Sequence, residues 1–207
     1  DPHLTQQLSQ TIEQLIQALA ESKKYLKKRK FNALQKWLGI DLDYGSSQVE
    51  YYQRLDRLLD QADHLSRKLQ IEIQKSQSRF QQILGLREQM AKHIVAAEEF
   101  LSEYPQFVKN QHPLDNFSER LSKKINTLRT LQSGNDIAIT QMQLSQQLSF
   151  SLLDRFKEAQ QVLIPAWQYH VKQSQTKHST SDLEKLDNSR ERLIKTLKKS
   201  LEKPSKS

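Results

Sequence analysis

The sequence contains no cysteine, which excludes disulfide-stapled scaffolds, thiolate metal sites and thiol redox chemistry. Glycine and proline are scarce, with 4 and 5 residues in a chain of 207. A small β-barrel needs many more turn residues than this, so it is excluded. No run reaches the ~18 apolar residues that a membrane-spanning helix needs. The chain must therefore consist of long elements that turn at few places.

What the chain does contain favours helices. Glutamine accounts for 27 residues, and hydrophobic residues make up only 36%, below the roughly 45–50% of a typical globular domain. Helices that each bury one narrow stripe need less apolar material than a compact globule does. We therefore predict an all-α fold, and we expect a cytoplasmic protein, with peripheral contact to a membrane as an open alternative. Because the first residue is Asp1 rather than Met, we also expect a processed product or a part of a longer protein.

The segment 47–104 carries the clearest helical pattern. Apolar residues recur there with alternating spacings of three and four, as on one buried helix face. Ser47 and Glu50 fit a capping box at its start, Pro105 is expected to end it, and Gly39 and Gly45 are expected to bracket a loop before it. Sixteen positions follow the spacing, and thirteen of them are apolar: Tyr52, Leu55, Leu59, Ala62, Ser66, Leu69, Ile73, Ser76, Phe80, Ile83, Arg87, Met90, Ile94, Ala97, Leu101 and Tyr104.

Further helices are predicted over 4–38 and 114–178. In the second of these we expect fraying near Gly134 and a kink near Pro165, because the proline ring removes one backbone hydrogen bond. Its apolar pattern is less regular than that of 47–104. The positions expected to face the core are Leu114, Phe117, Leu121, Leu128, Leu131, Ala138, Met142, Leu152, Phe156, Ala159, Leu163 and Ala166.

An amphipathic helix cannot stay single in water, so these segments are expected to pack together. We predict an elongated antiparallel helical bundle, coiled-coil-like, with 47–104 and 114–178 as its spine. Residues 1–178 are expected to form a single domain. The basic C-terminal segment 179–207 is predicted to form a last helix with Asp182 as its N-cap, packed on the bundle or extending it.

Motifs that carry chemistry are missing from the sequence. It has no Gly-rich phosphate loop, no nucleophile elbow and no His-Glu-x-x-His zinc pattern. Asp60 and His64 are spaced to share a metal on one helix face, but a solvated helical pair is the commoner meaning of this spacing. Glu98 and Glu99 are adjacent, so their carboxylates do not face each other on a helix. We therefore predict a protein that is not an enzyme and holds no cofactor and no metal.

Two clusters of basic residues are candidate contacts for anions. The first places six charges in eight positions, and the second lies in the C-terminal helix. Such faces bind nucleic acid or anionic lipid when they are exposed. The alternative is a solvated helix face whose long stems cover neighbouring apolar surface. The candidate contacts are Lys23, Lys24, Lys27, Lys28, Arg29, Lys30, Lys195, Lys198 and Lys199.

Three stretches resemble the TelA-type toxic-anion-resistance (tellurite-resistance) family of bacterial proteins. Residues 31–39, followed by 51–55, are similar to the family's short hydrophobic segment and its Tyr-rich helix start. Residues 58–101 resemble its long helix with regularly spaced Leu, and Ile164-Pro165-Ala166-Trp167 resembles its Ile-Pro-x-Trp signature. The resemblance covers roughly residues 31–178.

The resemblance implies a non-enzymatic helical interaction protein. Its members are associated with resistance to tellurite and other toxic agents, and with phage or envelope stress, so we expect a partner protein of the same system. Ile164, Pro165 and Trp167 are the candidate docking point, and packing at a bundle end is the alternative for them. The chain departs from the family at Gln146-Gln147, where members tend to carry Asn-Asn.

Three other functions are open from the sequence. The basic clusters allow a helical module that binds an anionic membrane surface or nucleic acid. Lys and Arg side chains allow direct sequestration of an oxyanion. The long apolar stripes allow a coiled-coil spacer that self-associates.

Overall fold

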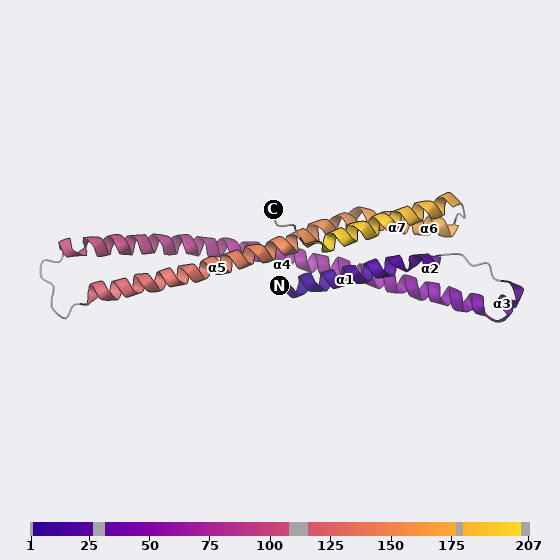
Figure 1. The fold of residues 1–207 in the computed structure, drawn as a ribbon, viewed down its shortest axis with the longest axis horizontal. Coiled ribbons are helices and arrows are strands. Elements are labelled where there is room, and N and C mark those ends of the chain that lie inside the picture. Colours follow the sequence, from indigo (N-terminus) through magenta and orange to yellow (C-terminus); the bar gives the residue numbers. More distant parts are fainter. Residues whose placement is uncertain (1, 27–31, 108–115, 177–179, 204–207) are drawn as a thin grey trace. The chain divides into compact units, whose positions relative to one another are not determined.

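The computed structural model describes residues 2–26, 32–107, 116–176 and 180–203, and within these residues it contains helices and no strand. The all-α prediction is confirmed, as is the prediction of two long helices (Figure 1). The helices are α1 (Pro2–Ala20), α2 (Ser22–Leu26), α3 (Ala33–Trp37), α4 (Ile40–Phe107), α5 (Phe117–Glu158), the π-helix η1 (Ala159–Leu163), α6 (Ile164–Thr176) and α7 (Thr180–Leu201).

Helix α4 is longer at both ends than predicted. It begins at Ile40, so Gly45 and the expected capping box at Ser47 lie inside the helix, and the expected loop before 47 is wrong. A single interior glycine costs about 1 kcal/mol, which a helix of 68 residues tolerates. Of Gly39 and Gly45, Gly39 is the one that lies between two helices, α3 and α4, and its φ of 74° favours glycine. Pro105 removes one hydrogen bond near the C-terminus, and the helix continues to Phe107.

The predicted helix over 4–38 is wrong as a single element. Helix α1 ends at Ala20, and short α2 and α3 follow it. At the first break the Glu21 N–H still donates to the Gln17 carbonyl (3.1 Å), while the Lys24 N–H donates three residues back, to the Glu21 carbonyl (2.9 Å). This tight spacing separates α1 from α2.

The breaks expected in the second long helix have different outcomes. Gly134 lies within α5, so the expected fraying is wrong. Ahead of Pro165 the helix adopts the π form, and the Ile164 N–H donates five residues back, to the Ala159 carbonyl. Proline lacks the N–H that would reach the Gln161 carbonyl, so one hydrogen bond of the α-helical pattern is missing there. The structure has a π-helix directly before Pro165, and the kink expected near this residue stays a prediction.

Backbone contacts group the chain into two compact units. Unit 1 comprises residues 1–73 and 148–207, and unit 2 comprises 74–147. The expectation of a single domain over 1–178 stays a prediction.

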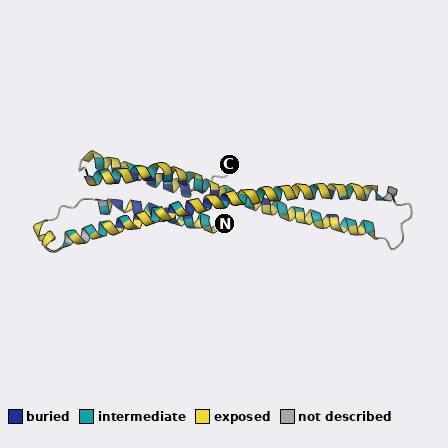
Figure 2. Ribbon diagram, turned by 180° about the vertical axis from the view of Figure 1, so that it is seen from behind, coloured by how far each residue is buried: buried dark blue, intermediate teal, exposed yellow. Residues whose placement is uncertain are grey.

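Unit 1 holds the larger core. There α7 packs against α1, α6 and η1, and an apolar face of α4 completes the cluster. The predicted Asp182 cap is wrong, because Asp182 lies in the first turn of α7 rather than before it. Figure 2 shows the helices coloured by how far each residue is buried. The largest fully buried apolar side chains of the core are Leu8, Ile12, Leu15, Leu19, Leu55, Leu69, Phe156, Leu193 and Leu197.

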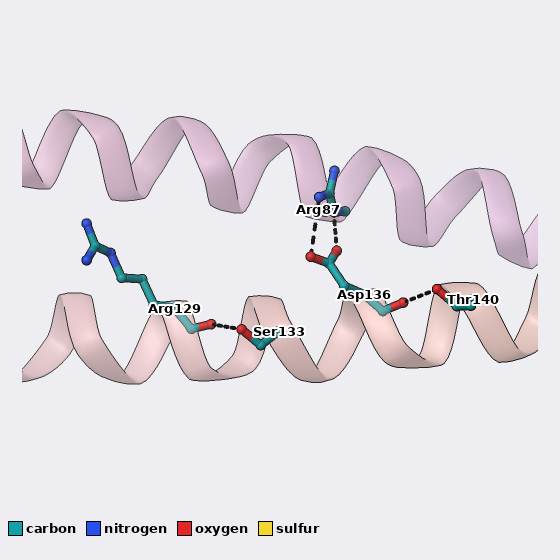
Figure 3. A network of polar contacts seen from close by, with 5 residues as sticks. All are labelled: Arg87, Arg129, Ser133, Asp136 and Thr140. Carbon is teal, nitrogen blue, oxygen red and sulfur yellow. Dashed lines mark hydrogen bonds and ion pairs between the residues drawn. The ribbon is translucent and has the colours of Figure 1, made fainter.

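Unit 2 is an antiparallel pair of helices formed by parts of α4 and α5. The Arg87 guanidinium binds the Asp136 carboxylate (Figure 3), and Arg129 binds Glu98. Residue numbers therefore fall on α5 as they rise on α4. The buried apolar side chains of this pair are Ile94, Ile125 and Ile139.

Among the described residues, no helix combines the length and the apolar character needed to cross a membrane.

Candidate functional site

The predicted docking point at Ile164, Pro165 and Trp167 is split between core and surface. Trp167 is 2% exposed and Ile164 is also buried, and both belong to the core of unit 1, whereas Pro165 is exposed. The buried Trp167 Nε1 makes no hydrogen bond within the described residues. This placement agrees with the packing alternative, and a docking role for the three residues stays a prediction.

Of the first predicted basic cluster, the structure describes Lys23 and Lys24. Lys27, Lys28, Arg29 and Lys30 lie outside the described residues. Lys23 pairs with Asp187 of α7 (3.4 Å), and the Lys24 ammonium lies 5.5 Å from the centre of the Tyr25 ring.

The C-terminal cluster lies further along α7. Lys195, Lys198 and Lys199 are exposed there, and Lys195 is eight residues past Asp187, or about 12 Å along a helix. The backbone carbonyl of Lys199 accepts a hydrogen bond from Arg155 Nη1 (3.0 Å). Contact of either cluster with an anion stays a prediction.

A buried arginine on α7 was not singled out by the sequence. The Arg190 side chain is only 7% exposed, and its Nη2 pairs with Asp187 Oδ1 (3.2 Å). Asp187 also pairs with Lys23, so the three charges tie α2 to α7. A hollow of about 410 Å³ beside them is lined by both acidic and basic residues. Opposite charges balance there, so the hollow favours neither anions nor cations.

A group of tyrosines joins α2 to α4 in unit 1. The rings of Tyr25 and Tyr51 stack with centroids 4.6 Å apart and an interplanar angle of 10°. The Tyr51 hydroxyl donates to the Ala18 carbonyl (2.5 Å). Burial raises the pKa of Tyr51 and the pKa of Tyr52, because each phenolate would lose its hydration. The hydroxyls thus stay protonated, and the cluster serves packing.

Helix α5 carries an unusual run without charge. Its residues 137–153 include no Asp, Glu, Lys, Arg or His, although charged residues make up 27% of the chain. Within unit 2 this run exposes Ile137 and Leu144, which are 62% and 59% accessible. Residues seven apart lie on the same side of a helix, and those two apart lie nearly opposite. Since Ile139 is buried, Ile137 and Leu144 lie on the side of α5 turned away from its buried stripe.

We call this surface the α5 outer face and define it as Ile137, Thr140, Gln141 and Leu144, all of which are exposed. Thr140 satisfies its own hydroxyl by donating to the Asp136 carbonyl (2.9 Å). The face therefore presents apolar side chains between uncharged polar ones. Sequence reasoning missed it, although the run without charge was the available signal.

Polar contacts between the helices hold this face in place. Arg87 Nη2 donates to Asp136 Oδ2 (3.4 Å) and Arg87 Nε donates to Asp136 Oδ1, while Gln146 Nε2 donates to the Ser76 hydroxyl (2.8 Å). The hydrogen bond from Arg87 lowers the pKa of the Asp136 carboxyl. These bonds lie on either side of the α5 outer face along the chain, and Figure 3 shows the one between Arg87 and Asp136.

In the part of the chain that the structure describes, no three His, Asp or Glu side chains gather as a metal site would require. Asp60 and His64, whose spacing would allow a shared metal, therefore have no third ligand among the described residues.

Comparison with curated proteins finds a distant relative of this chain. The chain is similar to Protein KlaA of Escherichia coli. The two are 27% identical over 170 residues, which cover 79% of this chain and 65% of KlaA. The chain thus spans just under two thirds of the length of KlaA. No family model matches the chain, and no solved structure matches it.

Proposed function

We propose that the chain is a non-enzymatic helical interaction protein of a toxic-anion (tellurite) or envelope- and phage-stress resistance system, related to the TelA-type family. Its resemblance to that family and its similarity to KlaA support this context. On this proposal the chain acts by holding a protein partner, with the α5 outer face as the contact.

The observation that carries the proposal is the pairing of missing charge with exposed apolar side chains on α5. A solvated helix is usually covered by charged residues, as the rest of this chain is. The centres of protein interfaces are depleted of charge and contain apolar side chains. Ile137 and Leu144 are placed as two anchors seven residues apart, which suits an amphipathic helix of the partner lying along α5.

The experiment introduces charge into this face and asks whether resistance is lost. Ile137→Glu and Leu144→Glu are combined in one variant, and Leu131→Glu is the matched control. Leu131 is a similarly exposed leucine (53%) on α5, but it lies six residues from Ile137 and therefore on another side of the helix. Both variants are compared in cells that depend on this chain for growth in tellurite.

We expect the double variant to lose resistance and the Leu131→Glu control to keep it, with equal helicity in both proteins. Loss of resistance in both variants would point to general damage, and retained resistance in both would contradict the proposed contact. Because all three side chains are exposed, the substitutions change stability by only about 0.5 kcal/mol or less.

A further inference from the structure

The apolar side of α3 faces solvent. Leu34, Trp37 and Leu38 follow the spacing of one helix face, and no residue of α3 is buried. Leu42, in the first turn of α4, is exposed as well. Their exposed fractions are 68% for Leu34, 82% for Trp37, 58% for Leu38 and 74% for Leu42. We call these four residues the α3 tip.

A glycine corner joins the two helices that carry the α3 tip (Figure 1). Gly39 has a φ of 74°, its N–H donates to the Lys36 carbonyl (3.1 Å), and its own carbonyl accepts from the Leu42 N–H (3.1 Å). The first bond lies at the C-terminal end of α3 and the second at the start of α4, with Gly39 between them. The corner thus holds the apolar side chains on both sides of Gly39 within one short surface segment.

The charge of the sequence segment that contains the α3 tip indicates the kind of surface that would cover it. Residues 23–43 contain seven basic and two acidic residues, and six of the seven basic ones are lysine. Lysine is depleted at protein–protein interfaces, whereas lysine-rich segments are attracted to anionic lipid. On α3 itself, Lys36 is two residues from Leu34 and therefore lies on the opposite side of the helix from the apolar one.

We propose that the α3 tip inserts into the interface of an anionic lipid surface and anchors the chain there. Trp37 supplies the ring that prefers the boundary between headgroups and acyl chains, and the three leucines supply apolar area below it. Lys36 and the neighbouring basic residues supply attraction to the headgroups. This contact is separate from the α5 outer face and does not depend on it.

The two tryptophans of the chain provide the test, because Trp37 is exposed and Trp167 is buried. In the full chain carrying Trp167→Phe, emission reports Trp37 alone. We expect a blue shift and co-sedimentation with vesicles rich in phosphatidylserine, both weakened by salt, and neither with pure phosphatidylcholine. Emission that stays unchanged in the phosphatidylserine vesicles, or equal binding to both vesicles, overturns the proposal.

Variants make the test specific to the α3 tip. Leu34→Glu combined with Trp37→Glu replaces two apolar side chains that would insert into the lipid. This double variant should weaken the partitioning of the protein into phosphatidylserine vesicles by about tenfold or more. The matched control is Leu86→Glu, at a leucine of α4 that is 60% exposed, and it should bind vesicles like the unaltered chain. If the double variant binds as well as the control, the proposal fails. It fails equally if the unaltered chain is a dimer that ignores vesicles and the double variant is a monomer, because a second copy then covers the α3 tip.

Discussion

The guanidinium of Arg87 on α4 donates two hydrogen bonds to the carboxylate of Asp136 on α5, across the helix pair of unit 2. Arg87 occupies a position in the apolar stripe predicted for α4, yet it is exposed at the edge of the contact. Its partner precedes the α5 outer face by one residue. The pair therefore marks the register in which the two helices face each other, directly before the α5 outer face.

Because of this ion pair, we expect the stability of unit 2 to fall at acidic pH. The bond from Arg87 lowers the pKa of Asp136 below its unfolded value, so its stabilising effect is present above about pH 4 and is lost as the pH falls through the lowered pKa. Asp136→Asn should therefore lower the melting temperature slightly at neutral pH and not at all in strong acid. Thermal unfolding followed by circular dichroism at the two pH values checks this. A difference between the proteins that persists in strong acid would contradict the role of the charge.

Tyr51 gives the opposite pH dependence in unit 1. Its pKa is raised by burial, so its contribution is complete below the unfolded value of about 10 and is lost as the pH rises toward the raised value. Tyr51→Phe leaves the Ala18 carbonyl without its hydrogen bond and should cost about 1 kcal/mol at neutral pH. It should also weaken the alkaline loss of stability. Tyr169→Phe, at an exposed tyrosine, is the control and should leave the urea midpoint unchanged.

Substitutions at Trp167 test whether this residue packs the core or docks a partner. Because its side chain is 2% exposed in the core of unit 1, Trp167→Ala should destabilise the protein by about 3–5 kcal/mol. Trp167→Phe removes no hydrogen bond, since Nε1 makes none within the described residues, and it should cost about 1.5 kcal/mol or less. Urea unfolding measures both. A Trp167→Ala protein of normal stability that fails to support resistance would restore the docking interpretation.

The glycines provide a test of the helix boundaries. Gly134 lies inside α5, and a Cβ there meets no atom within 4 Å, so Gly134→Ala should stabilise the helix by about 0.5–1 kcal/mol. Gly39 also has open space around it, but its φ is 74°. Gly39→Ala should therefore destabilise by about 1 kcal/mol through backbone strain. The two substitutions should shift the urea midpoint in opposite directions. A Gly39→Ala variant that is more stable than the unaltered protein would show that α3 and α4 are continuous.

The stripe of α4 could be predicted from the sequence because its apolar positions recur without interruption. Of the sixteen positions given, all except Arg87 are buried or partly buried. The helix ends were less predictable. Gly45 and Pro105 are local signals that weaken a helix by amounts smaller than the support of a long packed element, so the helix passes through both.

The stripe of α5 was predictable only in part. Leu131 and Ala138 were expected to face the core, but both are exposed, and Gln132, Asn135 and Ile139 lie inward in their place. Polar residues line this part of the helix contact, so an apolar pattern is a poor guide to which side is buried. The uncharged run then offers two candidate stripes, and only the pairing with Arg87 and Ser76 decides between them.

The most direct test of the central claim places a photo-crosslinking residue at Gln141, in the middle of the α5 outer face, in cells exposed to tellurite. The same residue at Leu131 is the control, because both positions are exposed and lie on different sides of α5. We predict one protein adduct of defined mass from position 141 and none from position 131. The adduct should disappear when Ile137→Glu and Leu144→Glu are added. Identical adducts from both positions, or an adduct at 141 that survives the two charges, would contradict a partner held by this face.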